Sequence, residues 1–126
     1  MGVSFPSHLR TFIIVMLYKK TNKLHNFMGI SFYEVKEYYS PLNPYVYIWY
    51  NSREKKFYIG STNGKTKSYT HSSSKMEYFN NLNVPYYMHR KILKEFTDPK
   101  KCKEFEKKLI ADRLRKKSNK YYNKNH

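Results

Sequence analysis

The stretch that decides the fold is Tyr45-Val-Tyr-Ile-Trp-Tyr-Asn-Ser-Arg-Glu-Lys-Lys-Phe-Tyr-Ile-Gly60. Its first six residues form an unbroken apolar and aromatic run, which is typical of a β-strand. Residues 51–54 supply polar turn chemistry, and residues 55–59 return to a strand pattern. The stretch therefore predicts a β-hairpin.

The two faces of this hairpin differ in character. A four-residue loop centred between Ser52 and Arg53 would place Tyr47 directly opposite Tyr58, and strand alternation would put both rings on one face. Gly60 ends the second strand, where the backbone can approach another group closely. The opposite face, where a core is expected, carries Val46, Ile48, Phe57 and Ile59. Composition alone leaves the paired tyrosines open to either a packing role or a chemical role.

The charge of the chain is strongly positive. The 126 residues contain 25 Lys and Arg against 9 Asp and Glu, a formal net charge of +16. Residues 45–126 hold twenty of the basic and seven of the acidic residues, which leaves +13 in that part. Such an excess favours a polyanionic partner, with nucleic acid as the first candidate and an anionic membrane as the second. An aromatic content of 18% suits both a core of large rings and surfaces that stack on bases.

The cysteine count and the hydropathy indicate the cellular compartment in which the protein works. Cys102 is the only cysteine of the sequence, which excludes an intramolecular disulfide and a multi-cysteine zinc site. We therefore expect a reducing, intracellular setting. The apolar run at residues 12–18 is far shorter than the roughly 20 residues that span a bilayer. We interpret it as core and expect no membrane partner; membrane association through this run and the basic surface is a further alternative.

Two prolines mark the main boundary of the chain. Pro41 and Pro44 cannot sit inside a helix or a central strand. Residues 1–44 therefore form an N-terminal extension of unclear role, with a strand or helix at 8–18 and one amphipathic element over 27–39. We predict that this extension packs on the following domain, residues 45–126, or contributes to a homodimer.

The rest of the chain predicts a third strand and a long helix. Residues 61–74 are mostly loop, residues 75–80 could start a helix, and residues 90–96 form a strand pattern. Thr97 or Asp98 can cap a helix with Pro99 in its first turn, and apolar residues recur at helical spacing to about Lys117. The expected fold class is α+β, a small three-stranded antiparallel sheet flanked by helices.

Glu106 stands out in this helix. It lies four residues after Cys102 and four before Ile110, so it shares their apolar stripe, whereas Glu104 is turned away by about 200°. A carboxylate at the buried edge of a helix needs a partner, because desolvating it alone costs several kcal/mol. The partner is either a Lys or Arg side chain or a divalent cation that keeps water in its other positions, as Mg²⁺ prefers.

Four segments together resemble the GIY-YIG nuclease domain. They are Tyr45-Val-Tyr47, Tyr58-Ile-Gly60, Glu106-Lys-Lys-Leu-Ile110 and Tyr122-Asn123. The resemblance spans about residues 45–123 and identifies residues 45–126 as a GIY-YIG-like nuclease domain. It implies a DNA endonuclease that hydrolyses phosphodiester bonds with Mg²⁺ or Mn²⁺, in a bacterial or phage-infected cytoplasm.

The resemblance also implies a role for individual residues. Tyr47 would contact the nucleophilic water and act as general base, and Tyr58 would position water or the scissile phosphate. Gly60 would let the backbone pass close to the site. Glu106 would be the metal ligand, and Asn123 a supporting residue. A free phenol has a pKa near ~10, so such a base requires a nearby cation that favours the phenolate.

The sequence departs from the family pattern at two points. Tyr45 replaces the glycine of the first triplet, which is a strand residue rather than a chemical one. The family's Arg-x-x-x-His element is matched by Lys67 and His71, and Lys lacks the bidentate fork with which Arg binds phosphate. His71 has an equally good explanation as an exposed loop histidine. Other cations that could replace the arginine are Lys65, Lys75 and Arg90.

The C-terminal helix carries a further excess of charge. Residues 100–124 hold eleven basic and three acidic side chains. Such a run usually forms a solvated helix face, but beside a nuclease site it could contact phosphates without reading sequence. The candidate DNA-binding residues there are Arg113, Arg115, Lys116 and Lys117. The alternative function is a basic nucleic-acid-binding protein of the same fold that is catalytically impaired, as the missing arginine would allow.

Overall fold

The computed structural model describes residues 24–33, 41–64, 70, 71, 73, 75–79 and 83–124. The chain separates into two units, residues 1–35 and residues 36–126. The element predicted at residues 8–18 lies outside the described residues, as does the segment at 34–40. The four segments that resemble the nuclease domain, within residues 45–123, all belong to the second unit.

The described part of the first unit is a β-hairpin. Strand β1, Leu24–Phe27, pairs antiparallel with β2, Ile30–Tyr33. The turn residues Met28 and Gly29 both have positive φ, 54° and 88°, as a two-residue hairpin turn of the primed type requires. The side chain of Asn26 accepts the Gly29 N–H at 3.0 Å. The single amphipathic element predicted over residues 27–39 is therefore interrupted by a turn.

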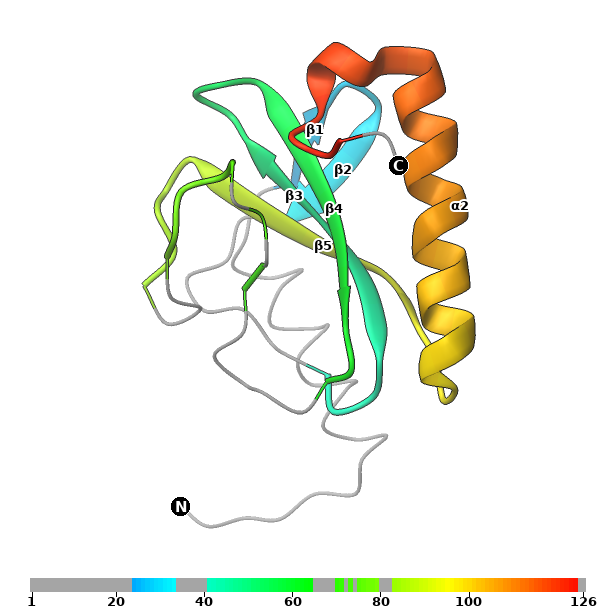
Figure 1. Ribbon diagram of the computed structural model, residues 1–126. Helices are drawn as coiled ribbons and strands as arrows, with labels where there is room; N and C mark the ends of the chain where they lie inside the picture. Colours follow the sequence, from blue (N-terminus) through cyan, green and yellow to red (C-terminus); the bar gives the residue numbers. More distant parts are fainter. Residues whose placement is uncertain are drawn as a thin grey trace, which may run out of the picture. The chain divides into compact units, whose positions relative to one another are not determined.

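The second unit contains a three-stranded antiparallel sheet with a long helix beside it (Figure 1). Strand β3, Tyr45–Asn51, is central; β4, Lys56–Thr62, and β5, Met88–Glu95, pair with its two edges. Helix α2, Pro99–Lys117, follows β5 and continues into a 3₁₀ turn, Ser118–Lys120. This arrangement confirms the predicted α+β fold class and the predicted third strand.

The register of the central hairpin differs from the predicted one. Tyr47 lies opposite Gly60, and Tyr58 lies opposite Trp49. The predicted direct pairing of Tyr47 with Tyr58 is therefore wrong by two residues. An even shift keeps side chains on their faces, because alternation has a period of two. The two tyrosines still share one face as diagonal neighbours, with ring centroids 6.3 Å apart.

The side chain of Asn51 explains this shift. Its Oδ1 accepts the backbone N–H groups of Arg53 and Glu54 at 2.9 and 3.0 Å, so the turn begins after Asn51. The turn ends at Lys55, which has a positive φ of 58° and donates its N–H to the Asn51 carbonyl at 2.7 Å. The four-residue loop is thus Ser52–Lys55, one position further along the chain than predicted.

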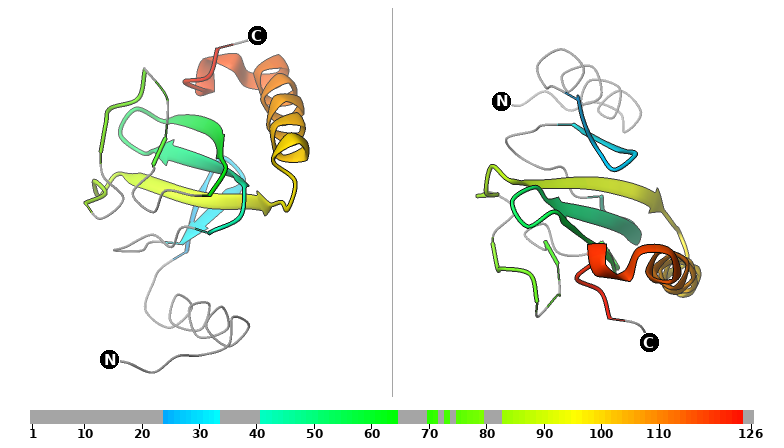
Figure 2. Two further views of the ribbon diagram at one scale, coloured as in Figure 1. Left: turned by 60° about the horizontal axis from the view of Figure 1, so that its bottom comes forward. Right: turned by 90° about the horizontal axis from the view of Figure 1, so that it is seen from above.

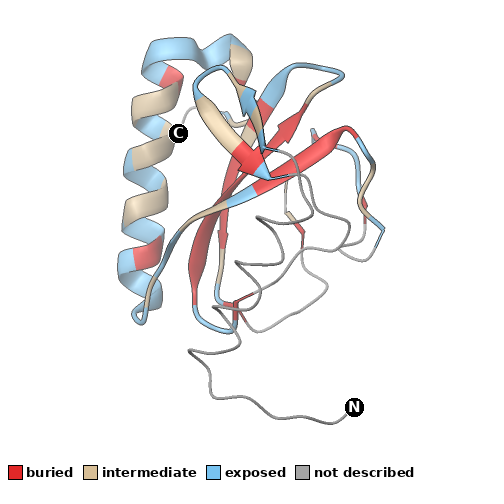
Figure 3. Ribbon diagram, turned by 180° about the vertical axis from the view of Figure 1, so that it is seen from behind, coloured by how far each residue is buried: buried red, intermediate tan, exposed pale blue. Residues whose placement is uncertain are grey.

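Both faces of the central strand are covered. Every residue of β3 is buried, as the red central strand of Figure 3 shows. Helix α2 lies on one side of the sheet, and the described residues among 70–79 lie on the other (Figures 1 and 2). The face of Val46 and Ile48 forms the predicted core. The face of Tyr47 and Trp49 is a second core, because Thr70 and Phe79 contact Trp49 there.

Helix α2 begins where its capping residues predict. Asp98 is the N-cap, and its Oδ1 accepts the Lys100 N–H at 2.9 Å, with Pro99 as the first helical residue. Cys102 and Leu114 are its buried residues. None of the helices in the described ranges is both long enough and apolar enough to cross a membrane.

The helix start predicted at residues 75–80 is not observed in the described residues 75–79. The hydroxyl oxygen of Ser73 accepts the N–H groups of Lys75 and Met76, both at 3.1 Å. These bonds form a local side-chain turn.

Candidate active site

The side chain of Tyr47 crosses the backbone of Gly60 on the neighbouring strand. A Cβ atom built on Gly60 would lie 3.0 Å from Cε1 of Tyr47 and closer still to its Cζ and hydroxyl oxygen. Tyr47 itself is fully buried. A glycine is therefore needed at position 60 so that the phenol can lie there, as the sequence suggested.

Tyr58 and His71 extend this group of side chains. The rings of Tyr58 and His71 meet edge to face with centroids 6.0 Å apart, and both residues are half-buried. His71 Nδ1 accepts the Ser73 N–H at 3.1 Å, so its Nε2 carries the proton and donates to the Glu77 carbonyl at 2.8 Å. Burial lowers the pKa of His71. His71 is thus a neutral, well-anchored side chain rather than an exposed loop histidine.

Trp49 anchors the segment that carries His71. Its indole Nε1 donates to the Thr70 carbonyl at 2.9 Å, and its ring meets Phe79 edge to face at 4.9 Å. Thr70 in turn donates its hydroxyl to the Phe79 carbonyl at 2.9 Å. Sequence reasoning missed this role, although strand alternation placed Trp49 on the same face as Tyr47 and Tyr58.

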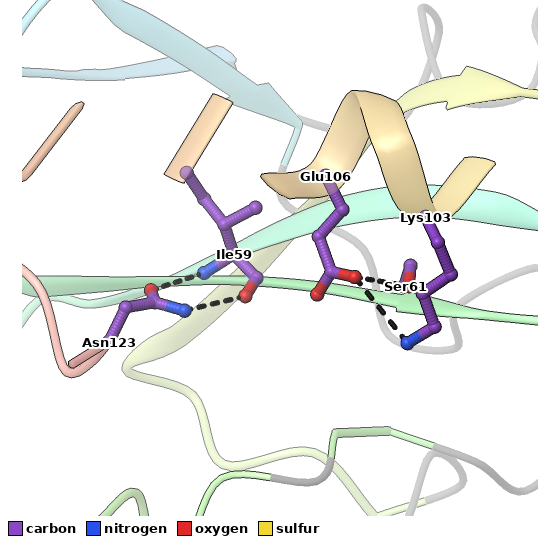
Figure 4. Close-up of polar contacts among 5 residues, drawn as sticks. All are labelled: Ile59, Ser61, Lys103, Glu106 and Asn123. Atoms are coloured by element: carbon purple, nitrogen blue, oxygen red, sulfur yellow. Dashed lines mark hydrogen bonds and ion pairs between the residues drawn. The ribbon is translucent and has the colours of Figure 1, made fainter. Parts of the chain in front are cut away.

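Glu106 points from α2 toward strand β4 (Figure 4). Its Oε1 accepts the Ser61 hydroxyl at 2.7 Å and lies 3.5 Å from Lys103 Nζ, and its side chain is only 15% exposed. Both contacts are made by Oε1, and Figure 4 draws none at the second oxygen. Glu104 is exposed, as predicted. Ser61, which sequence reasoning missed, therefore orients the carboxylate.

The tyrosines and Glu106 approach β4 at neighbouring residues. The Tyr47 phenol lies over Gly60, and the Glu106 carboxylate bonds the side chain of Ser61. Side chains of adjacent strand residues point to opposite faces, so the two groups come from opposite sides of this edge strand. The candidate site is therefore centred on residues 60 and 61 of β4.

A divalent cation at this site would have one protein carboxylate. No group of three His, Cys, Asp or Glu side chains that could hold a metal is present among the described residues. Mg²⁺ is commonly bound through one or two carboxylates, with water and phosphate oxygens in the remaining positions. The single, oriented carboxylate of Glu106 fits such an ion. The nearby Lys103 ammonium partly neutralises it.

Asn123 holds the C-terminal segment against the outer edge of β4. Its Oδ1 accepts the Ile59 N–H at 2.9 Å, and its Nδ2 donates to the Ile59 carbonyl at 2.8 Å (Figure 4). The Tyr122 N–H also donates to the Phe57 carbonyl at 2.7 Å. These bonds occupy backbone groups that an edge strand would otherwise expose. Asn123 thus supports the strand that carries Tyr58 and Gly60.

The cations predicted to contact phosphate lie in several places. Lys65 and Lys67 lie outside the described residues. Arg90 is buried opposite Trp49, with its guanidinium carbon 6.0 Å from the indole centroid, and so shares the face of the tyrosines. Lys75 is exposed and lines a pocket of about 520 Å³ beside Asn123.

The basic residues of α2 gather at its C-terminal end. Arg115 and Lys116 lie 2.7 and 3.5 Å from the two carboxylate oxygens of Asp112, so their charges are partly neutralised. Lys117 is exposed and Arg113 half-buried. None of these four is among the side chains described above as contacting Gly60 or Ser61. Positive charge at a helix C-terminus also stabilises the helix itself.

Comparison with known proteins gives one match. A family model described as the GIY-YIG catalytic domain matches residues 43–122, which is well over half of the chain. Neither the search of curated proteins nor that of solved structures gave a match.

Proposed function

Because the chain belongs to the GIY-YIG family of nuclease domains, we propose that it is a DNA endonuclease that hydrolyses phosphodiester bonds with a divalent metal ion. The observation that carries the proposal is that the Tyr47 phenol and the oriented Glu106 carboxylate lie against two adjacent residues of β4, Gly60 and Ser61. In phosphodiester hydrolysis a phenol can accept a proton from the attacking water, and a carboxylate can hold the metal ion. The charge of +16 supports a polyanionic substrate.

Glu106 is the residue proposed to hold the ion, which is Mg²⁺ or Mn²⁺. When bound, such an ion stabilises negative charge on the phosphate and on the leaving 3′ oxygen. The hydroxyl of Ser61 fixes one carboxylate oxygen of Glu106, and the other oxygen is the one proposed to bind the ion. Hydrogen-bonded ligands of this kind lose less freedom when the metal arrives.

Tyr47 is proposed as the general base and Tyr58 as the residue that positions water or phosphate. The Tyr47 hydroxyl lies over the backbone of Gly60, which presents no side chain that would displace it or block a water molecule there. Tyr47 is fully buried, whereas Tyr58 is half-buried. Tyr58 is therefore the more accessible of the two to water and substrate. His71 holds the Tyr58 ring in place.

The variants Tyr47→Phe and Tyr58→Phe separate these two roles. Each removes a hydroxyl while keeping the ring. We expect Tyr47→Phe to reduce the rate of the chemical step under single-turnover conditions by about 10²-fold or more, as for loss of a general base. A larger loss for Tyr58→Phe would reverse the assignment.

The ion pair between Lys103 and Glu106 favours a second candidate function. An ammonium group 3.5 Å from the carboxylate can replace a metal ion in balancing its charge. The chain would then bind nucleic acid without cutting it. Lys103 is 69% exposed, so this pair is weak and a divalent ion would displace it readily.

Plasmid nicking distinguishes the two functions. The full-length protein is incubated with supercoiled plasmid in Mg²⁺ or Mn²⁺, with EDTA as the control. Glu106→Gln keeps the shape of the side chain and removes its charge, and the exposed Glu104→Gln is the matched variant on the same helix. We expect metal-dependent nicking by the wild type and by Glu104→Gln, and none by Glu106→Gln.

Two outcomes would contradict the endonuclease proposal. Nicking by Glu106→Gln at the wild-type rate would remove Glu106 from the mechanism. No nicking by any form, together with DNA binding that weakens steeply with salt, would favour the binding module instead.

A further inference from the structure

Two tyrosines outside the candidate active site are almost fully exposed. Tyr78 and Tyr86 are 82% and 84% exposed, more than any other large apolar or aromatic side chain in the described residues. Scattered exposed rings are normal on protein surfaces and need no explanation by themselves. The surroundings of this pair are therefore what matters.

Tyr86 packs on a neighbouring residue that is bonded to the β3–β4 turn. Tyr86 meets the buried ring of Tyr87 edge to face at 5.2 Å, with an angle of 90° between the ring planes. The Tyr87 carbonyl accepts both the N–H and the hydroxyl of Ser52 at 2.9 and 3.1 Å. The Arg53 guanidinium lies 4.2 Å from the centroid of the Tyr87 ring. Tyr86 is thus connected to the β3–β4 turn through Tyr87.

A chain of contacts connects the pair with each other and with the candidate site. The Tyr87 hydroxyl donates to the carboxylate of Glu77, the residue that precedes Tyr78. The Glu77 carbonyl accepts His71 Nε2 at 2.8 Å, and His71 packs on Tyr58. Residues 75–79 and the segment that leads into β5 accordingly lie side by side (Figures 1 and 2). We name Tyr78 and Tyr86 the tyrosine pair.

The charges near the tyrosine pair suit a phosphate backbone. Arg53 and Lys55 on the β3–β4 turn and Lys75 on the segment of Tyr78 are all exposed. The acidic side chains there are already engaged, because Glu77 accepts the Tyr87 hydroxyl and Glu54 accepts the Tyr122 hydroxyl. The surface therefore combines exposed rings with exposed cations.

We propose that the tyrosine pair stacks on unpaired bases of a DNA strand, so that the preferred substrate contains a single-stranded segment next to the cleavage site. Aromatic side chains interleaved with cations form the usual platform for single strands, because every base offers a ring face. Paired bases in a duplex present only their edges in the grooves, so two exposed rings gain little from an intact helix. This proposal rests on the proposed endonuclease function, whose substrate it specifies.

Fluorescence anisotropy tests the proposal without cleavage. The full-length protein is titrated in EDTA, at one fixed salt concentration, against a labelled oligo(dT) and against a duplex of the same length. We expect Tyr78→Ala and Tyr86→Ala each to weaken single-strand binding by about 5-fold or more, since stacking on one ring contributes that much. Duplex binding should change by less than about 2-fold. Tyr78→Phe and Tyr86→Phe keep the ring and should bind like the wild type.

A second measurement reports stacking directly. Stacking quenches the fluorescence of 2-aminopurine placed in the single strand, and the alanine variants should lose this quenching. Unchanged single-strand affinity in both alanine variants would overturn the proposal, as would an equal loss on single strand and duplex. The first result would leave a protein partner as the occupant of the pair.

The outcome is independent of the nicking assay. A protein that does not nick plasmid but binds single strands through the tyrosine pair would keep this proposal and lose the endonuclease. A protein that nicks plasmid but shows no effect of Tyr78→Ala or Tyr86→Ala would do the reverse.

Discussion

The phenol of Tyr47 on the central strand lies directly over the backbone of Gly60 on the edge strand. Both residues are buried, and the register pairs them as opposite neighbours. This relationship ties the two signature triplets to each other physically. It also makes the glycine a condition for the position of the tyrosine.

Gly60→Ala should therefore displace Tyr47. We expect a loss of unfolding free energy of about 1–3 kcal/mol, as for other overpacked cores, and a marked loss of nicking activity. In a Tyr47→Leu background the same change should cost much less, because the shorter side chain does not reach the added methyl group. Urea denaturation of the four proteins measures this coupling. Additive losses would mean that the two residues do not interact.

Ser61→Ala should weaken metal binding. Its hydroxyl donates to Glu106 at 2.7 Å, and loss of such a supporting hydrogen bond typically reduces metal affinity by about 10-fold or more. Ser61→Thr keeps the hydroxyl and serves as the control. Mn²⁺ binding followed by electron paramagnetic resonance gives the affinity, and the Mg²⁺ concentration for half-maximal nicking should rise in parallel. Equal Mn²⁺ affinities in all three proteins would show that Ser61 does not orient the ligand.

Asn123→Ala should destabilise the edge of the sheet. It removes both hydrogen bonds to Ile59, which together contribute about 1–3 kcal/mol. The exposed Asn119→Ala, only four residues earlier, should change stability by less than about 0.5 kcal/mol. Urea denaturation compares the three proteins. Hydrogen exchange at the Ile59 amide should accelerate only in Asn123→Ala, and unchanged protection there would mean that Asn123 does not stabilise this edge.

His71 should make stability depend on mildly acidic pH. Its pKa is lowered from an ordinary value of 6.5 because burial disfavours the imidazolium. As the pH falls below 6.5, the unfolded chain takes up the proton first, so the folded state loses stability down to the lowered pKa. Protonation of Nδ1 would also break the bond from the Ser73 N–H.

The matched variant for this test is His71→Gln, which does not titrate. Denaturation at pH 7.5 and pH 5.5 should show a larger loss for the wild type than for the variant, since the other histidines contribute equally to both. Parallel losses would mean that His71 does not contribute to the pH dependence.

Local pattern was sufficient for much of the fold. The alternation in residues 45–60 predicted the hairpin and its two faces, and the Asp98–Pro99 cap predicted where α2 begins. The spacing of Glu106 from Cys102 predicted that its side chain lies at the buried edge of the helix. These features depend on residues within one or two turns of each other. They can therefore be predicted without knowledge of the rest of the chain.

Other features depended on contacts that no local pattern encodes. The hairpin register was decided by the side chain of Asn51, which begins the turn one residue later than the composition suggests. The core on the tyrosine face arises because Trp49 bonds Thr70, 21 residues away. The role of each cation likewise depends on what lies beside it, as the burial of Arg90 against Trp49 illustrates.

The sequence by itself thus determined which face of its element each candidate residue occupies, because this follows from the periodicity of strands and helices. Only the tertiary structure decided which of them meet. Tyr47 reaches Gly60 through the strand register, and Glu106 reaches Ser61, 45 residues earlier in the chain, through the packing of α2 on the sheet. Contacts over such separations are set by the packing of the whole core rather than by any single segment.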